Sequence, residues 1–351
     1  MVKESNLEKG ISAIIPTYKG EAFISKLLDS LINQSIDPKL FEAIFIVNGE
    51  LDSTPDIIKK YQEENPQINI ILTYSEPGVC NARIDIANRQ YTIFIDDDDY
   101  ISYNYFEKLY QYAKPNRIVI GTFLDVNENT GEIQESYLSK PLLESSGINT
   151  NPYTDEMQGI LTITTDKLIP TKDVKNSSFN PELKNGVDIS YYARFYVDYD
   201  FEFYIIDKKE KAIYYRLWRD NSISRKPLSY DFNITDRLKV INDINKGLKK
   251  AKTPAMVGFI KSLTGGQVSK INKYLEKHPN DYIKILKDIA SYNFEFFPYK
   301  YLNENLNDLD NSKRELIISY AFSPTNITTS NSVVKRILTE KKNVDVIYGS
   351  L

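Results

Sequence analysis

The sequence has 351 residues but only one histidine, His278, and one cysteine, Cys80. A single histidine excludes histidine-based catalytic triads and metal sites with several histidine ligands. Acid–base chemistry must therefore come from carboxylates, lysine or tyrosine. A single cysteine excludes an internal disulfide framework and fits a reducing compartment.

Long apolar runs are also missing. No run reaches the roughly 18 residues that a membrane span needs, and the first residues lack the apolar segment of a signal peptide. The formal net charge is only −4, with both signs interspersed, which argues against a dedicated nucleic-acid binder. We therefore expect a cytoplasmic protein, with peripheral contact at the inner face of the membrane left open.

The most informative stretch is a short apolar run, residues 91–95, that ends in four consecutive carboxylates, Asp96 to Asp99. The run is typical of a buried strand. Four adjacent negative charges are most easily kept where a cation, or a cation with phosphates, neutralises them. A solvated acidic turn is the alternative, and the fusion to a buried strand favours a metal site.

Strand and helix patterns alternate through the first hundred residues. Apolar runs predict strands at 11–16, 42–47, 68–73 and 91–95, and helical spacing predicts helices at 21–33, 55–64 and 79–88. Such alternation indicates a parallel α/β sheet, in which the loops after the strands form one ligand crevice.

The residues expected in that crevice suit a nucleotide. Tyr18 can stack on a base, Asn48 can hydrogen-bond it, and a helix starting near Gly78 can face negative charge. Neither G-x-G-x-x-G nor G-x-x-x-x-G-K-[ST] occurs, which argues against a dinucleotide site of the Rossmann type and against a P-loop.

The middle of the chain is less regular. We expect a helix at 102–113, strands at 117–124, 159–168 and 212–218, and a polar excursion at 125–150. Asp188 stands alone before an aromatic run with helical character. The segment Trp218 to Arg225 is rich in cations and hydroxyls, which suits a diphosphate.

The character of the chain changes after Pro227, which indicates a separate helical domain. Amphipathic spacing predicts helices at 232–251, 254–263, 267–277, 280–292, 312–321 and 330–340. We therefore divide the chain into domains 1–227 and 228–351.

Four segments, in this order, carry a resemblance to a known family. They are Ile15-Pro16-Thr17-Tyr18, Asn48 to Thr54, Gly78 to Arg83 and Phe94 to Asp99. Residues 1 to about 225 resemble family 2 glycosyltransferases of the GT-A fold, a mixed, mostly parallel sheet flanked by helices. The helical C-terminal domain lies outside this resemblance, and acceptor binding, oligomerisation and membrane docking remain open for it.

The resemblance implies a metal-dependent, inverting transfer of a hexose or N-acetylhexosamine. The donor would be a nucleotide-sugar, usually a UDP-sugar, and the acceptor a hydroxyl of a glycan, lipid-linked or glycoprotein acceptor. Bacterial surface polysaccharide, teichoic-acid or glycoprotein glycan synthesis is the implied setting. Mn²⁺ or Mg²⁺ would bridge the diphosphate.

The resemblance also assigns roles to individual residues. Asp188 matches the catalytic carboxylate, Asp98 and Asp96 match metal ligands, and Asp97 is expected to point away as the variable middle position. Asp99 is expected behind the metal ligands or facing the donor sugar. The matched nucleotide-sugar-binding residues are Pro16, Thr17, Tyr18, Asn48, Arg83, Asp96, Asp97, Arg216, Arg219, Ser222 and Ser224.

Three departures from the family pattern matter. Val47-Asn48 replaces a pair of acids, which leaves uracil less certain as the base. Val187 replaces the glutamate that usually precedes the catalytic aspartate. Arg219 stands near a position where many relatives have a histidine, so metal coordination would rest on carboxylates, diphosphate and water.

Other interpretations stay open. Asp188 could cap the following helix, and Tyr191, Tyr192 and Tyr196 could form either an acceptor platform or a packed core. Lysines between 246 and 252 could contact anionic lipid, a polyanionic acceptor or only solvent. For the whole chain, the alternatives are a sugar nucleotidyltransferase and a catalytically silent nucleotide- or glycan-binding scaffold.

Overall fold

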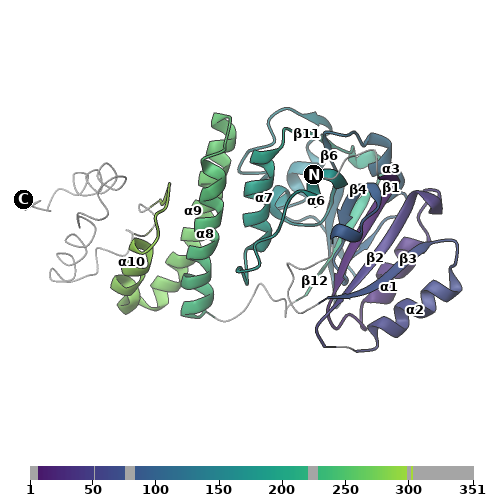
Figure 1. Ribbon diagram of the computed structural model, residues 1–351, viewed down its shortest axis with the longest axis horizontal. Helices are drawn as coiled ribbons and strands as arrows, with labels where there is room; N and C mark the ends of the chain where they lie inside the picture. The colour runs from purple at the N-terminus through teal and green to yellow at the C-terminus, as the bar shows by residue number, and fades with distance from the viewer. Residues whose placement is uncertain (1–6, 51, 76–83, 220–227, 299–301, 303–351) are drawn as a thin grey trace, which may run out of the picture. The chain divides into compact units, whose positions relative to one another are not determined.

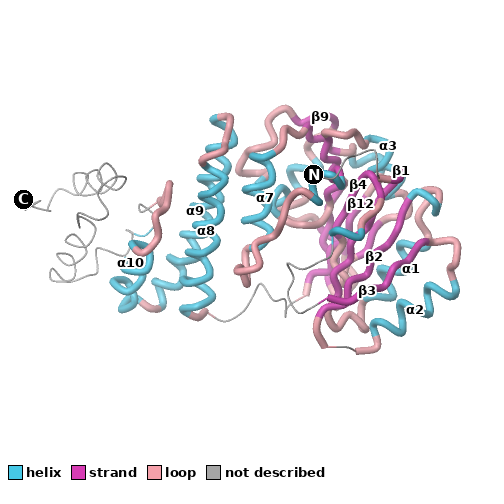
Figure 2. Tube along the Cα trace, in the orientation of Figure 1, coloured by secondary structure: helices cyan, strands magenta, loops and turns pink. Residues whose placement is uncertain are grey.

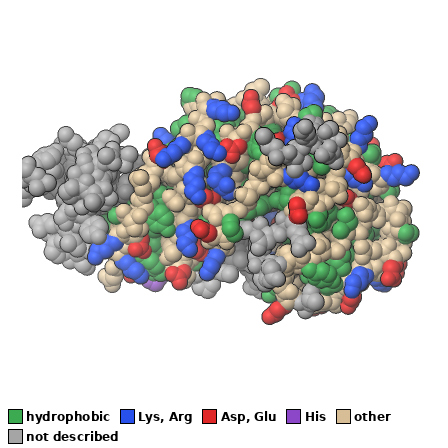
Figure 3. Space-filling model, in the orientation of Figure 1, with side chains coloured by type: hydrophobic (Ala, Val, Ile, Leu, Met, Phe, Trp, Pro, Cys, Tyr) green, Lys and Arg blue, Asp and Glu red, His purple; other side chains and the backbone are tan. Residues whose placement is uncertain are grey.

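The computed structural model describes residues 7–50, 52–75, 84–219, 228–298 and 302. The chain forms two compact units (Figure 1). One comprises Met1–Glu182 and Val187–Lys226, and the other comprises Leu183–Gly186 and Pro227–Leu351. Charges of both signs are interspersed over the face that Figure 3 shows.

The first unit is built on an eight-stranded sheet with the order β3-β2-β1-β4-β10-β6-β11-β9. Neighbouring strands from β3 to β4 are parallel, whereas β10 is antiparallel to both β4 and β6. Figure 2 shows helices to either side of these strands. The strands are β1 (Glu8–Thr17), β2 (Phe41–Asn48), β3 (Asn69–Ser75), β4 (Arg89–Phe94), β6 (Arg117–Ile120), β9 (Gly147–Asn149), β10 (Lys167–Pro170) and β11 (Glu202–Ile205).

A second sheet of four strands has the order β5-β12-β7-β8. Its strands are β5 (Tyr100–Ile101), β7 (Thr122–Asn127), β8 (Ile133–Gln134) and β12 (Ile213–Trp218). The chain passes from β6 to β7 at Gly121, where an added Cβ would lie 2.7 Å from the Tyr105 ring and 2.9 Å from Asp166 Oδ1. Only glycine fits there without a shift, so the predicted strand 117–124 is divided between two sheets.

The described part of the first unit contains seven α-helices, and the longer ones follow from amphipathic spacing. For example, α1 buries Ile24, Leu27, Leu28 and Leu31, which recur at helical spacing on one face. The helices are α1 (Ile24–Ile32), α2 (Thr54–Glu64), α3 (Tyr105–Tyr112), α4 (Lys140–Leu143), α5 (Gln158–Thr162), α6 (Thr171–Lys175) and α7 (Val187–Asp198). Single 3₁₀ turns lie at Pro38–Leu40, Ile84–Ile86 and Lys208–Glu210.

Two sequence predictions in this unit are wrong. The segment predicted as strand 159–168 begins within the short helix α5, in which the Thr162 hydroxyl donates to the Gln158 carbonyl, and a strand begins only at Lys167. The predicted helix 79–88 is a 3₁₀ turn at Ile84–Ile86 in its described part, and its first residues lie outside the described ranges.

The described part of the second unit is helical. It contains α8 (Asp236–Leu248), α9 (Pro254–Lys277) and α10 (Tyr282–Ala290), with a π-helical turn at Asp231–Thr235 and a 3₁₀ turn at Pro279–Asp281. The helices share a core that includes Leu238, Ile241, Val268, Ile271 and Ile285.

The predicted break at Gly265-Gly266 is wrong, because α9 continues through it with Leu263 and Gln267 buried on either side. Helices predicted at 312–321 and 330–340 lie outside the described residues. Within the described ranges, no helix combines the length and apolar character needed to cross a bilayer.

Candidate active site

The carboxylates that end β4 form a compact group at the C-terminal edge of the parallel strands. One oxygen from each of Asp96, Asp98 and Asp99 lies within 4.8 Å of the others. Such a set of hard oxygen ligands fits Mn²⁺ or Mg²⁺. The group follows the buried strand residues Ile93, Phe94 and Ile95, as the sequence predicted.

Strand β12 fixes the back of this group. The Tyr214 hydroxyl donates to Asp99 Oδ2 at 2.7 Å and accepts from the Asp96 backbone N–H at 3.1 Å. The Leu217 N–H donates to Asp99 Oδ1 at 2.8 Å. Asp99 is buried, and its two oxygens are already bonded to the protein, so Asp96 and Asp98 are the freer carboxylates.

Desolvation and nearby like charges both raise the pKa of Asp96. The surrounding protein and the carboxylates of Asp98 and Asp188 raise the pKa of Asp96 to about 7, although the residue keeps an exposed surface. A bound cation would reverse this effect by favouring the ionised carboxylate. The electrostatic interaction with Asp188 indicates that these two separately predicted residues lie near each other.

Asp97 is not part of the candidate metal group, and its carboxylate faces the end of β1. Its Oδ2 accepts from the Thr17 hydroxyl at 2.5 Å and from the Tyr18 N–H at 3.1 Å. An added Cβ on Gly20 would lie 2.8 Å from the same oxygen, so the end of β1 closes tightly around it. Asp97 therefore anchors the start of the loop that carries Tyr18. Its position in the acidic run did not reveal these contacts.

The predicted base-binding residues lie at the ends of β1 and β2. Tyr18 is 55% exposed, and Lys19 Nζ lies 5.5 Å from the centre of its ring. Asn48 is nearly buried, and its side-chain oxygen accepts a hydrogen bond from the Ser75 hydroxyl. Pro16 lies within β1, opposite Ile46 of β2. These residues, with Thr17, are therefore gathered at one edge.

The two described arginines near β12 are both paired with aspartates. Arg216 makes a two-pronged contact with Asp125, at 2.9 Å from Nε and 2.8 Å from Nη2. Arg219 pairs with Asp98, and its guanidinium lies 4.8 Å from the Phe23 ring centroid. Arg219 thus neutralises the predicted metal ligand and stands beside the acidic group. Arg83, Ser222 and Ser224 lie outside the described residues.

Asp188 lies in the first turn of α7 rather than before it. Burial raises the pKa of Asp188, while a hydrogen bond from the Thr164 side chain and the charge of Lys167 lower it. A carboxylate with a raised pKa is suited to accept a proton from a hydroxyl. Tyr191, Tyr192 and Tyr196 on the same helix are buried, which confirms the core interpretation.

Sequence reasoning missed four residues here: Thr164, Lys167, Asp125 and Tyr214. Lys167 left one signal, a lone cation before the apolar residues Leu168 and Ile169. Asp125 and Tyr214 are brought to the site by the pairing of β7 with β12, whereas Thr164 lies in the bend between α5 and β10.

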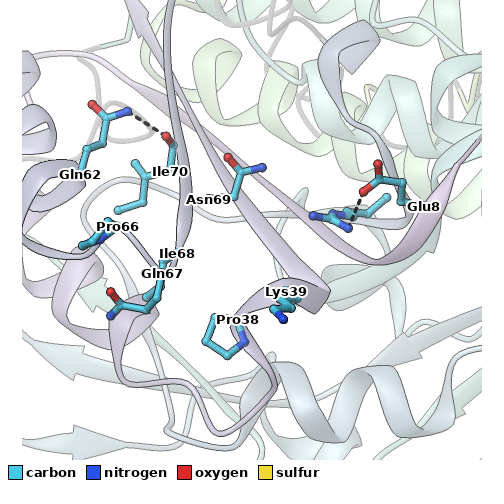
Figure 4. A pocket seen from close by; sticks show the side chains of 10 residues that line it. Glu8, Pro38, Lys39, Gln62, Pro66, Gln67, Ile68, Asn69 and Ile70 are labelled. Carbon is cyan, nitrogen blue, oxygen red and sulfur yellow. Dashed lines mark hydrogen bonds and ion pairs between the residues drawn. The ribbon is translucent and has the colours of Figure 1, made fainter.

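A hollow of about 580 Å³ lies elsewhere, at the N-terminal ends of β1, β3 and β4 (Figure 4). Glu8 and Arg89, two of its charged lining residues, pair with each other at 2.7 Å. Because the predicted site residues lie at the opposite ends of the strands, we do not assign this hollow to their chemistry.

Comparison with known proteins agrees with the fold. Residues 12–171, just under half of the chain, match the model of glycosyl transferase family 2. Over 123 residues the chain is 33% identical to the poly(ribitol-phosphate) beta-glucosyltransferase of Bacillus spizizenii, a match to 33% of this chain and 19% of that protein. Over 164 residues it is 29% identical to the glycosyltransferase GlyA of Streptococcus pneumoniae, covering 44% and 23%. The matches thus span less than a quarter of either relative.

Solved structures extend the likeness to nearly the whole chain. S. aureus TarS 1–349 in complex with UDP-GlcNAc is similar with a TM-score of 0.59 and 19% identity, covering 97% of this chain and 95% of that one. The mannosyltransferase PcManGT of Pyrobaculum calidifontis, in complex with GDP-Man and Mn²⁺, has a TM-score of 0.52 and 12% identity, covering 95% and 88%. The predicted GT-A fold is thereby confirmed, and the family-model match over residues 12–171 agrees with the predicted resemblance to family 2 glycosyltransferases.

Proposed function

We propose that this chain transfers a hexose or N-acetylhexosamine from a nucleotide-sugar, most simply a UDP-sugar, to a hydroxyl of a glycan acceptor. The observation that carries the proposal is the carboxylate group at the end of β4, where one oxygen from each of Asp96, Asp98 and Asp99 lies within 4.8 Å of the others. The charge of Asp188, on α7, contributes to the raised pKa of Asp96, which supports a base near this candidate diphosphate–cation site. The match of residues 12–171 to the model of glycosyl transferase family 2 supports the reaction class.

In this proposal Asp188 takes the proton from the acceptor hydroxyl as that oxygen attacks the anomeric carbon. Attack from the face opposite the leaving group inverts the configuration. The Thr164 side chain and the Lys167 charge favour the ionised form of Asp188, although burial still raises its pKa overall. Tyr18 offers its exposed ring to the base, and Asp97 holds the loop of Tyr18 in place.

The diphosphate would be held by Asp98 and Asp96 through Mn²⁺ or Mg²⁺, which when bound stabilises the charge that develops on the leaving nucleotide. Arg219 is placed to contribute as well, since its guanidinium already contacts Asp98. Arg83, Arg216, Ser222 and Ser224 are proposed to complete the donor site, with Arg216 sharing its guanidinium with Asp125.

The acceptor class is proposed from the relatives. Two of them are named for poly(ribitol-phosphate) glycosylation. A bacterial surface polymer of this kind is accordingly the first acceptor to test. For the C-terminal unit we keep three proposed roles, namely acceptor binding, self-association and peripheral contact with the inner membrane face.

A panel of nucleotide-sugars with Mn²⁺ or Mg²⁺ tests the donor, scored by thermal stabilisation and by slow hydrolysis to free sugar. We expect one UDP-sugar to stabilise the protein and to be hydrolysed only with the metal. Stabilisation by no nucleotide-sugar would contradict the proposal. Release of pyrophosphate from a nucleoside triphosphate and a sugar phosphate would instead identify a nucleotidyltransferase.

Asp188→Asn tests the chemistry. We expect transfer to fall by about 10²- to 10⁴-fold, the typical contribution of a general base, with UDP affinity within about twofold of wild type. If the wild type binds UDP-sugar without turnover and the variant behaves identically, the chain is a binding scaffold. Full activity of Asp188→Asn would show that another group is the base.

A further inference from the structure

Lys167, the first residue of β10, is fully buried in the first unit. Its Nζ donates to the backbone oxygens of Ile160 at 2.8 Å and Thr165 at 3.2 Å, and also to that of Ile163. The ammonium lies 4.6 Å from the centre of the Tyr192 ring. Within the described part of the chain, no carboxylate forms a salt bridge with Lys167.

A fully buried ammonium is costly. Removing such a charge from water costs several kcal/mol even after the protein relaxes. Burial accordingly lowers the pKa of Lys167 to about 7, against the attraction of Asp166 and Asp188. An apolar side chain such as methionine has similar length and would fill the same space without this cost. Packing alone therefore does not account for a lysine at this position.

The contacts of Lys167 converge on Asp188. Two of the carbonyls it binds, those of Ile163 and Thr165, flank Thr164 on both sides. The Thr164 side chain in turn hydrogen-bonds to the Asp188 carboxylate. The ammonium therefore fixes the backbone from which this hydroxyl reaches Asp188.

Helix α7 is tied to the same turn. Tyr192, one helical turn after Asp188, donates its hydroxyl hydrogen to the Thr164 carbonyl at 3.3 Å. The ring of Tyr192 also faces the ammonium. Lys167 thus links the 163–165 turn and the helix that carries Asp188, and it supplies a positive charge near that carboxylate.

We propose that Lys167 is a positioning residue for the transfer reaction: its ammonium fixes the 163–165 turn, to which Tyr192 ties helix α7, so that Thr164 orients the Asp188 carboxylate. The inference rests on the proposed function, because it assigns Lys167 a role only through Asp188. It concerns the rate of proton removal and predicts no contact between Lys167 and either substrate.

The test compares Lys167→Met with Arg117→Met. Arg117 is also nearly buried, and it stands at the start of β6, whose last residue Ile120 pairs with Lys167. It binds Glu202 through Nε at 2.5 Å and the Tyr112 carbonyl through Nη1 at 2.9 Å. Both variants remove a buried cation from neighbouring strands, but only one of these cations is linked to Asp188.

For Lys167→Met we expect kcat to fall by about 10- to 100-fold, as for other supporting residues, with KM for the donor and Kd for UDP within about twofold. The acid limb of the pH profile of kcat/KM should move to higher pH, because losing a nearby cation raises the pKa of Asp188. The other titratable groups facing Asp188 are Asp96 and Tyr192, and both variants retain them. Arg117→Met should keep the wild-type profile.

Thr164→Val provides the test if Lys167→Met fails to fold, because Thr164 is only partly buried and valine has the same shape. We expect the same loss of kcat with unchanged KM, and a double variant no slower than the slower single one. Equal kcat losses for Lys167→Met and Arg117→Met with an unmoved acid limb, or full activity of Thr164→Val, would overturn the inference. The proposed function fails separately, if the wild type has no transfer activity or Asp188→Asn keeps it.

Discussion

Charged side chains are paired at the N-terminal edge of the large sheet, whereas like charges are crowded together at its C-terminal edge. At the N-terminal ends of the strands, Glu42 is buried against the Ser12 hydroxyl at 2.6 Å and the Asn88 N–H at 2.8 Å, and Arg89 pairs with Glu8 at 2.7 Å. At the C-terminal ends, Asp96 and Asp99 face like charges, which help to raise their pKa values. Paired charges support a fold, whereas crowded carboxylates oppose it and mark a binding site.

The largest effect should follow from Glu42→Ala at the N-terminal edge. It leaves the Ser12 hydroxyl and the Asn88 N–H without their buried acceptor and removes a charge 3.9 Å from Arg89. We expect the free energy of unfolding to fall by about 3–5 kcal/mol. Urea unfolding measures it. UDP affinity of the folded fraction should not change, and a weakened affinity would argue against the separation of the two edges.

At the C-terminal edge, Asp98→Ala should weaken UDP binding and leave stability unchanged. We expect metal-dependent UDP affinity to fall by about 10- to 100-fold, because a proposed metal ligand and the partner of Arg219 are both lost. Stability without metal should not fall. Calorimetric titration of UDP with and without Mn²⁺ measures the metal-dependent affinity. Equal affinities of variant and wild type in both conditions would reject Asp98 as a metal ligand.

Asp166→Asn should stabilise the protein at neutral pH. Burial raises the pKa of Asp166 to about 7, although the Tyr105 hydroxyl bonds its Oδ1. Unfolded aspartate ionises near pH 4, so this carboxyl makes the wild type less stable as the pH rises from about 4 to 7. Asparagine cannot ionise, and it tolerates the left-handed backbone at this position, where φ is 57°.

Urea unfolding at pH 4.5 and pH 7.5 should show the advantage of Asp166→Asn, about 1 kcal/mol or more, mainly at the higher pH. Lys167 remains protonated in both folded and unfolded chains below its folded pKa of about 7, so its contribution stays constant over most of this interval. An equal gain in the free energy of unfolding at both pH values would show that ionisation of Asp166 is not the cause.

Glu8→Ala should have the smallest effect. Its salt bridge with Arg89 involves a Glu8 side chain that is 71% exposed, and exposed pairs contribute about 0–1 kcal/mol. Differential scanning fluorimetry should show a small shift or none, with unchanged UDP binding. A loss as large as that of Glu42→Ala would mean that the pairing itself, rather than burial, determines stability at this edge.

Much of the first unit could be predicted from sequence because its strands are short apolar runs, as in β1, β2 and β4. The error at 159–168 arose because Ile160, Leu161 and Ile163 fit a strand pattern, while Thr162 bonds back to Gln158 and closes a helical turn. The error at Gly265-Gly266 arose because burial on α9 outweighs glycine's poor helix propensity.

The carboxylates of the site could be predicted because a run of acids after a buried strand is visible locally. The contacts of Asp97 with Thr17 and of Arg216 with Asp125 could not, since each joins residues about 80 to 90 positions apart. Lys167 acts through carbonyl groups, which no side-chain pattern reveals.

The Tyr214 hydroxyl has a consequence for engineering. It joins the backbone of Asp96 to the carboxylate of Asp99, yet it belongs to the other sheet and lies more than a hundred positions later in the chain. In a chimera that takes only the four-aspartate segment from a relative, the new aspartates would lack the β12 residues that hold them in place in that relative. The segments that must be exchanged together are therefore discontinuous in sequence: the end of β4 and the whole of β12.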